Sequence, residues 1–112
     1  ESFRRIDANP DYLLLGARDD GGALMGSLLA ILCHDVAGSC RPFMVLENVI
    51  VSSGYRRQGV GRRLIARIEE YARERNCYYI MFVSGADRQA AHRFYGSMGY
   101  SPNAVKGFKK YL

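Results

Sequence analysis

The chain has 112 residues, of which 48% are hydrophobic and 24% are charged. These values are typical of a globular domain and exclude a disordered or collagen-like chain, and the length predicts one domain over residues 1–112. No apolar run approaches the ~20 residues that a membrane-spanning helix needs, and the opening stretch lacks the pattern of a secretory signal. Three cysteines without a C-x-x-C pair indicate neither a disulfide framework nor a zinc site. We therefore expect a cytoplasmic protein without a metal or a membrane partner.

The charge is divided unevenly along the chain. Residues 1–55 carry four basic and seven acidic side chains, a net charge of −3, whereas residues 56–112 carry twelve and four, a net charge of +8. This segregation favours an anionic partner for the second half, either a phosphorylated cofactor or a nucleic acid. A solvated basic face without a ligand is the alternative.

The first half of the sequence predicts a lead-in followed by strands. Residues 1–12 have no clear period and include Pro10, so we interpret them as a lead-in or the remnant of something longer. Apolar runs at 12–18 and 23–34, separated by the turn residues Asp19-Asp20-Gly21-Gly22, predict a β-hairpin. The run 43–51 is rich in Val, Leu and Ile and predicts a central strand.

A βαβ unit is predicted to follow. Val60, Leu64 and Ile68 recur on one face of an amphipathic helix that begins near Gly59 and ends near residue 75. The apolar run 78–83 then predicts a strand parallel to the central one, reached by a right-handed crossover.

The C-terminal part predicts one more helix and an end to the sheet. Residues 88–98 have a helical pattern, and Gly99 stands where a C-cap glycine is expected. Residues 100–112 are expected to form one or two closing strands. The fold class is therefore α/β, of the α+β kind, with a mixed and mostly antiparallel sheet.

The segment between the predicted central strand and the next helix carries the strongest chemical signal. It reads Ser53-Gly54-Tyr55-Arg56-Arg57-Gln58-Gly59-Val60-Gly61-Arg62-Arg63. Its glycines let the backbone present N–H groups to a ligand, and the N-terminus of a helix attracts anions, so a pyrophosphate site is predicted. A Walker loop is excluded because no Lys-Ser or Lys-Thr follows Gly61, and a dinucleotide fingerprint is excluded because Leu64 replaces its third glycine.

Two motifs in this sequence resemble those of the GNAT superfamily of N-acetyltransferases. Arg56-Arg57-Gln58-Gly59-Val60-Gly61 has the form R-x-x-G-x-G, and Phe94-Tyr95-Gly96-Ser97-Met98-Gly99-Tyr100 has the form F-Y-x-x-x-G-[FY]. The resemblance covers about residues 12–112. Three further stretches resemble the small-molecule acetyltransferases of this superfamily: residues 46–51, 90–93 and 108–110. The resemblance implies acetyl-CoA as co-substrate and a splayed parallel pair of central strands. The chain is too short for all of the family's N-terminal strand and helices, so we expect the acceptor side to be incomplete, disordered or supplied by a partner.

The resemblance also implies residues that bind acetyl-CoA. The pantetheine arm would lie along Val49, Ile50 and Val51. The pyrophosphate would lie on the residues of the glycine loop, which are Arg56, Arg57, Gln58, Gly59, Val60, Gly61 and Arg62. Arg88 stands where relatives often have an Asn near the cofactor, and it could reach a phosphate instead.

Two residues are candidates for acid–base chemistry. Tyr95 matches the family tyrosine that protonates the leaving thiolate, the alternative being an aromatic side chain packed on the sheet. Glu47 interrupts an apolar strand just before the cofactor contacts, which makes it the candidate base, with a solvent-facing strand residue as an equally weighted alternative.

The expected function is acetylation of a primary amine of a small molecule by direct attack within a ternary complex. Two alternatives are a basic nucleic-acid-binding module and a catalytically inactive acyl-CoA sensor. The enzyme interpretation implies no nucleic-acid partner. Because many relatives form dimers, a homodimer through the aromatic C-terminal segment is a further expectation.

Overall fold

A computed structural model describes residues 2–112, with side chains described from residue 4 onward. The chain separates into two compact units, Glu1–Phe82 and Val83–Leu112. The organisation of residues 1–112 as one domain stays a prediction.

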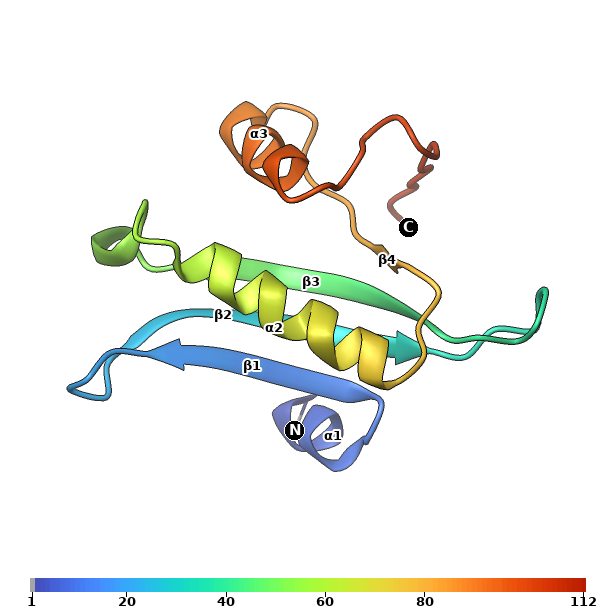
Figure 1. The fold of residues 1–112 in the computed structure, drawn as a ribbon, viewed down its shortest axis with the longest axis horizontal. Helices are drawn as coiled ribbons and strands as arrows, with labels where there is room; N and C mark the ends of the chain where they lie inside the picture. The colour runs from blue at the N-terminus through green and yellow to red at the C-terminus, as the bar shows by residue number, and fades with distance from the viewer. Residues whose placement is uncertain (1) are drawn as a thin grey trace. The chain divides into compact units, whose positions relative to one another are not determined.

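The first unit is a four-stranded sheet with a long helix across one face (Figure 1). The strand order is β1-β2-β3-β4, with antiparallel pairing between the first three strands and parallel pairing between β3 and β4. The predicted fold class, hairpin, central strand and following helix are confirmed. The elements are α1 (Ser2–Ala8), β1 (Tyr12–Arg18), β2 (Leu24–Cys33), β3 (Phe43–Val51), the 3-10 helix η1 (Ser53–Tyr55), α2 (Val60–Glu74) and β4 (Ile80–Met81).

The core of this unit lies between α2 and the sheet. Alternate residues of β2 and β3 are buried on the α2 side, and the apolar stripe of α2 covers them. Full burial of a Val, Leu, Ile or Met side chain contributes about 1.5–3 kcal/mol to the stability of the folded state, relative to an exposed side chain. The buried apolar residues are Leu28, Ala30, Met44, Leu46, Val60, Leu64, Ile65, Ile68 and Ala72.

The sequence did not predict a helix in the lead-in over residues 1–12, but Ser2–Ala8 form α1. This helix contacts β1 and lies beside it in Figure 1. A helix of seven residues is too short to be stable alone, so tertiary contact and not local periodicity determines it. One helix therefore precedes the sheet in the described chain, at the end where family elements were expected to be incomplete.

The strand predicted over residues 78–83 is much shorter in the structure. Its pairs with β3 are Met44 with Ile80 and Val45 with Met81. Within the described residues the ladder between these strands ends there, whereas β3 continues to Val51. The expected splayed parallel pair is thus present, and the edge of β3 after Val45 lies outside this ladder.

β3 contains a β-bulge that the sequence analysis did not predict. Ser27 pairs with Ile50 and Leu29 pairs with Glu47, so β3 has one residue more than β2 in this interval. Asn48 takes up the extra residue with a left-handed φ of 55°. The bulge reverses the alternation of the strand.

The second unit contains α3 (Gln89–Ser97). Gly99 has a φ of 94°, and the N–H of Tyr100 donates to the carbonyl oxygen of Tyr95 at 3.1 Å, which confirms the predicted glycine C-cap. The closing strands predicted over residues 100–112 are wrong, since this described segment contains no strand. Its large exposed apolar residues do not follow the two-residue period of a strand. They are Val105, Phe108, Tyr111 and Leu112.

We predict that Gly26→Val destabilises the first unit by about 1–3 kcal/mol, the usual cost of overpacking a core. A Cβ at Gly26 would lie 2.8 Å from the carbonyl oxygen of Ile50 and 3.1 Å from the side chain of Val60. Urea denaturation measures the change. Gly54→Ala is the control, because a Cβ there would have nothing within 4 Å. Equal stability of the two variants would show that the close approach at Gly26 is not as described.

Candidate functional site

The glycine loop connects the end of β3 to the start of α2. Ser52 fixes its beginning, because the Ser52 N–H donates to the carbonyl oxygen of Met25 at 2.8 Å. Farther along, Arg57 and Gly59 both adopt left-handed backbone, with φ values of 64° and 80°. Gly59 is the N-cap of α2, and no side chain caps this helix in the described part of the chain. The first turn of α2 is therefore accessible to an anionic ligand.

Two side chains of the loop hold the loop itself together. Nε of Arg56 donates to the carbonyl oxygen of Val51 at 3.4 Å, and Nε2 of Gln58 donates to that of Gly54 at 3.2 Å. These bonds tie Arg56 to the end of β3 and Gln58 to η1. They indicate that the loop offers backbone groups to a ligand while these side chains stabilise its turn.

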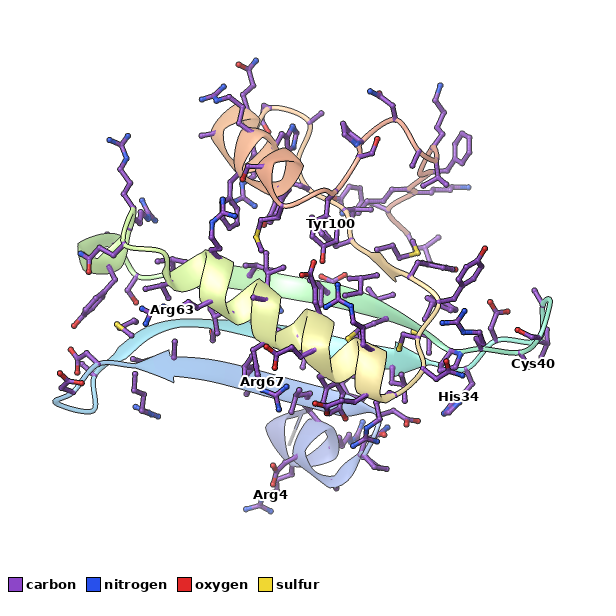
Figure 2. The ribbon with its side chains drawn as sticks, viewed as in Figure 1. Arg4, His34, Cys40, Arg63, Arg67 and Tyr100 are labelled. Carbon is purple, nitrogen blue, oxygen red and sulfur yellow. The ribbon has the colours of Figure 1, made fainter. Side chains whose placement is uncertain are left out.

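Further basic charge follows the loop along α2. Arg63 and Arg67 succeed one another on this helix in Figure 2, and both are exposed. The guanidinium of Arg67 is 3.7 Å from a carboxylate oxygen of Glu70 and 3.9 Å from one of Glu74. Carboxylates of α2 therefore balance the charge of Arg67 in the middle of the helix.

The loop has a contact that the sequence analysis missed. The hydroxyl of Tyr55 donates to Oδ2 of Asp19 at 2.6 Å, from η1 to the turn between β1 and β2. This hydrogen bond raises the pKa of Tyr55 and is the largest cause that lowers the pKa of Asp19. No local pattern could reveal it, because the two residues are 36 positions apart.

The last residues of β3 bring the predicted pantetheine contacts next to the loop. Val49 and Val51 are half-buried, whereas Ile50 is 57% exposed. Glu47 is exposed, one residue before the bulge, and pairs with Leu29 of β2. Solvent can thus stabilise its carboxylate, as both interpretations of Glu47 require.

Tyr95 and Arg88 belong to the second unit. Tyr95 is the buried residue of α3 at 8% exposure, and its ring centroid is 5.4 Å from that of Phe94. Arg88 is the N-cap residue of α3, and its N–H donates to the carbonyl oxygen of Gly85 at 3.1 Å. Both residues are thus fixed by the local structure around α3.

Other chemical groupings are sparse in residues 2–112. No three His, Cys, Asp or Glu side chains there are grouped as metal ligands. His34 has Nε2 3.3 Å from Oδ2 of Asp11, at an exposed position. The helices described are too short or too polar to cross a membrane.

Known proteins resemble this chain in both sequence and fold. Residues 1–100 match the model of the acetyltransferase (GNAT) family. The chain is 27% identical over 101 residues to the aminoglycoside N(6′)-acetyltransferase type 1 of Serratia marcescens. The aligned region covers 88% of this chain and 69% of that protein.

Solved structures agree with the sequence comparison. A protein of Agrobacterium tumefaciens str. C58 that is named as an acetyltransferase matches with a TM-score of 0.91 and 27% identity, over 99% of this chain and 76% of its own. A transcriptional regulator of Bacillus halodurans C-125 matches with a TM-score of 0.91 and 26% identity. This match covers 99% of this chain and 73% of the regulator. The chain belongs to the GNAT family and is an acetyl-CoA-dependent N-acetyltransferase.

Proposed function

We propose that this enzyme acetylates a primary amine of a small polycationic molecule of the aminoglycoside type, by direct attack within a ternary complex. The observation that carries the proposal is the continuity of the site. The edge of β3 that extends beyond its ladder with β4 leads directly into a glycine loop and an uncapped helix N-terminus. The Serratia marcescens relative, which is named for action on the 6′-amine of an aminoglycoside, supports the choice of acceptor.

The residues present fit acetyl-CoA, which supplies the activated acetyl thioester. A Cβ at Gly59 would have nothing within 4 Å, so the space beside the left-handed backbone is open. In our proposal Val49, Ile50 and Val51 present main-chain groups to the pantetheine amides. The diphosphate is held by the loop, by residues Arg56, Arg57, Gln58, Gly59, Val60, Gly61 and Arg62, and Arg88 supplies a further positive charge.

Tyr95 and Glu47 are proposed for proton transfer. Tyr95 donates a proton to the leaving sulfur. Glu47 accepts the proton of the attacking amine through a water molecule, since an alkylammonium with a pKa of ~10.4 is not a nucleophile. If Glu47 is the base, Glu47→Gln lowers kcat/KM most at neutral pH. As the pH rises towards the amine pKa, the difference in kcat/KM between variant and wild type becomes smaller, because more of the amine is already neutral.

The basic second half of the chain is less suited to a nucleic acid than its net charge indicates. Arg67 pairs with two carboxylates of its own helix. The guanidinium of Arg75 lies 4.7 Å from the ring centroid of Tyr71. Part of the charge therefore supports α2 itself, which favours the enzyme over a module that binds phosphate backbones.

The function is tested with a matched pair of acceptors. We expect CoA release from acetyl-CoA with an aminoglycoside that carries a 6′-amine and none with the 6′-hydroxyl congener, measured by thiol titration. Binding of acetyl-CoA without turnover over a broad amine panel would favour the sensor. DNA or RNA binding with a steep salt dependence, and no binding of CoA, would favour the nucleic-acid module.

Tyr95→Phe is predicted to lower kcat by about 10²-fold, at the low end of the effect of general acids, because a CoA thiolate is a fair leaving group. The KM for acetyl-CoA should change little, since the ring is retained. Steady-state kinetics measures both constants. Tyr111→Phe, at a phenol that is 83% exposed, is the control and should behave as the wild type. An unchanged kcat in Tyr95→Phe would remove Tyr95 from the mechanism.

Gly59→Ala is predicted to weaken acetyl-CoA binding by about 5- to 30-fold. The left-handed φ of 80° costs a residue with a side chain about 1–2 kcal/mol, and the loop would relax away from the binding conformation. Calorimetry with acetyl-CoA measures the change. Gly38→Ala is the matched control, because Gly38 also has a positive φ and open space around it. An equal loss of affinity in both variants would contradict a local role of Gly59.

A further inference from the structure

The hydrogen bond between Tyr55 and Asp19 ties the glycine loop to a distant turn. Tyr55 is the last residue of η1, directly before Arg56. Its hydroxyl is 2.6 Å from Oδ2 of Asp19, a length typical of bonds between a hydroxyl and a charged carboxylate. The turn between β1 and β2 and the loop before α2 lie at the same end of the sheet in Figure 1. The bond therefore adds a contact to the turn itself, beyond the bonds of Ser52 with Leu24 and Met25 at the start of β2.

Asp19 is itself held rigidly. Its other carboxylate oxygen, Oδ1, accepts the N–H groups of Gly21 and Ala23, both at 2.9 Å. The backbone N–H of Asp19 also donates to the carbonyl oxygen of Ala23 at 2.9 Å. One oxygen thus organises the turn while the other receives Tyr55, so the acceptor is in place before the loop docks on it.

The loop beyond Tyr55 needs such an anchor. Arg57 has a left-handed φ of 64°, which is unfavourable for a residue with a side chain. The hydrogen bonds of Arg56 and Gln58 go to Val51 and Gly54 in the same segment, so they shape the turn without placing it on the sheet. Tyr55 supplies a contact with a different element at the start of this strained stretch.

We propose that Tyr55 and Asp19 are positioning residues that hold the glycine loop in its diphosphate-binding conformation before acetyl-CoA arrives. The proposal rests on the proposed use of this loop for the diphosphate. Ordering a loop in advance lowers the cost of binding and leaves the chemical step unchanged. The pair should therefore act on affinity for acetyl-CoA and not on kcat.

The bond is retained over a wide range of pH. The lowered pKa of Asp19 means that its stabilising contribution is present above the ordinary carboxyl pKa and is lost as the pH falls through the folded value. The raised pKa of Tyr55 means that its contribution is present below the ordinary phenol pKa and is lost as the pH rises through the folded value. The effect of removing the bond should thus be equal at pH 6.5 and pH 9.

Tyr55→Phe removes the hydroxyl and retains the ring. We expect the Kd and KM for acetyl-CoA to rise about 3- to 10-fold, as for loss of one hydrogen bond, with kcat within about 2-fold of the wild type. S-acetylpantetheine, a thioester without the diphosphate, should give the same kcat/KM with both proteins. Tyr71→Phe, another tyrosine substitution in the first unit, is the matched control. A double-mutant cycle with Asp19→Asn should show that the two changes are not additive.

Several results would overturn the proposal. An equal fall of kcat/KM with both thioesters, or a lower kcat at unchanged KM, would mean that Tyr55 does not act through the diphosphate. Wild-type affinity for acetyl-CoA in Tyr55→Phe would also end it, and the proposed function would be unaffected. If the wild-type protein itself fails to bind acetyl-CoA, the proposed function fails and the positioning role fails with it. Melting temperatures of both phenylalanine variants identify a general loss of folding.

Discussion

At Gly26 the backbones of β2 and β3 approach closely and the side chains of α2 pack against them, and this packing holds both ends of the glycine loop. This glycine of β2 leaves room for the carbonyl oxygen of Ile50, near the end of β3, and for the side chain of Val60, at the start of α2. The two ends of the glycine loop are thereby held against one residue, and the loop must reverse direction over residues 52–59. A chain that turns so tightly needs left-handed backbone, which is found at Arg57 and Gly59. The core packing of α2 thus constrains both ends of the loop that adopts this conformation.

The bulge in β3 changes which residues face α2 just before the glycine loop. Before Asn48 the even-numbered residues of β3 face α2, and after it Val49 and Val51 are the half-buried ones. A regular strand would turn these two residues away from the core and bury Ile50 instead. The bulge lies on the part of β3 that extends past its ladder with β4. The pairing of β3 with β2 is irregular at the bulge, and within the described residues β4 does not pair with β3 beyond Val45. Main-chain N–H and C=O groups that would be hydrogen-bonded in a regular sheet are therefore left without a strand partner.

Strong periodicity explains which elements the sequence predicts. The hairpin, β3 and α2 each bury one face, so their alternation or helical stripe is visible without a structure. The extent of β4 and the helix α1 depend instead on neighbours that lie elsewhere in the chain. The glycine loop was predictable because its chemistry is local. Its anchor was not, because a Tyr and an Asp in polar turns have no pattern that pairs them.

Asp19 places a negative charge beside the proposed anion site, and its contacts hold that charge within the turn between β1 and β2. A carboxylate at the edge of a loop that receives a diphosphate would repel the ligand if its charge were open to the site. Here the hydroxyl of Tyr55 and the amides of Gly21 and Ala23 all donate to it. These three donors stabilise the anionic form, in agreement with its lowered pKa. Asp19 therefore keeps its negative charge, and in the proposed site the arginines of the loop have to outweigh its repulsion of the diphosphate.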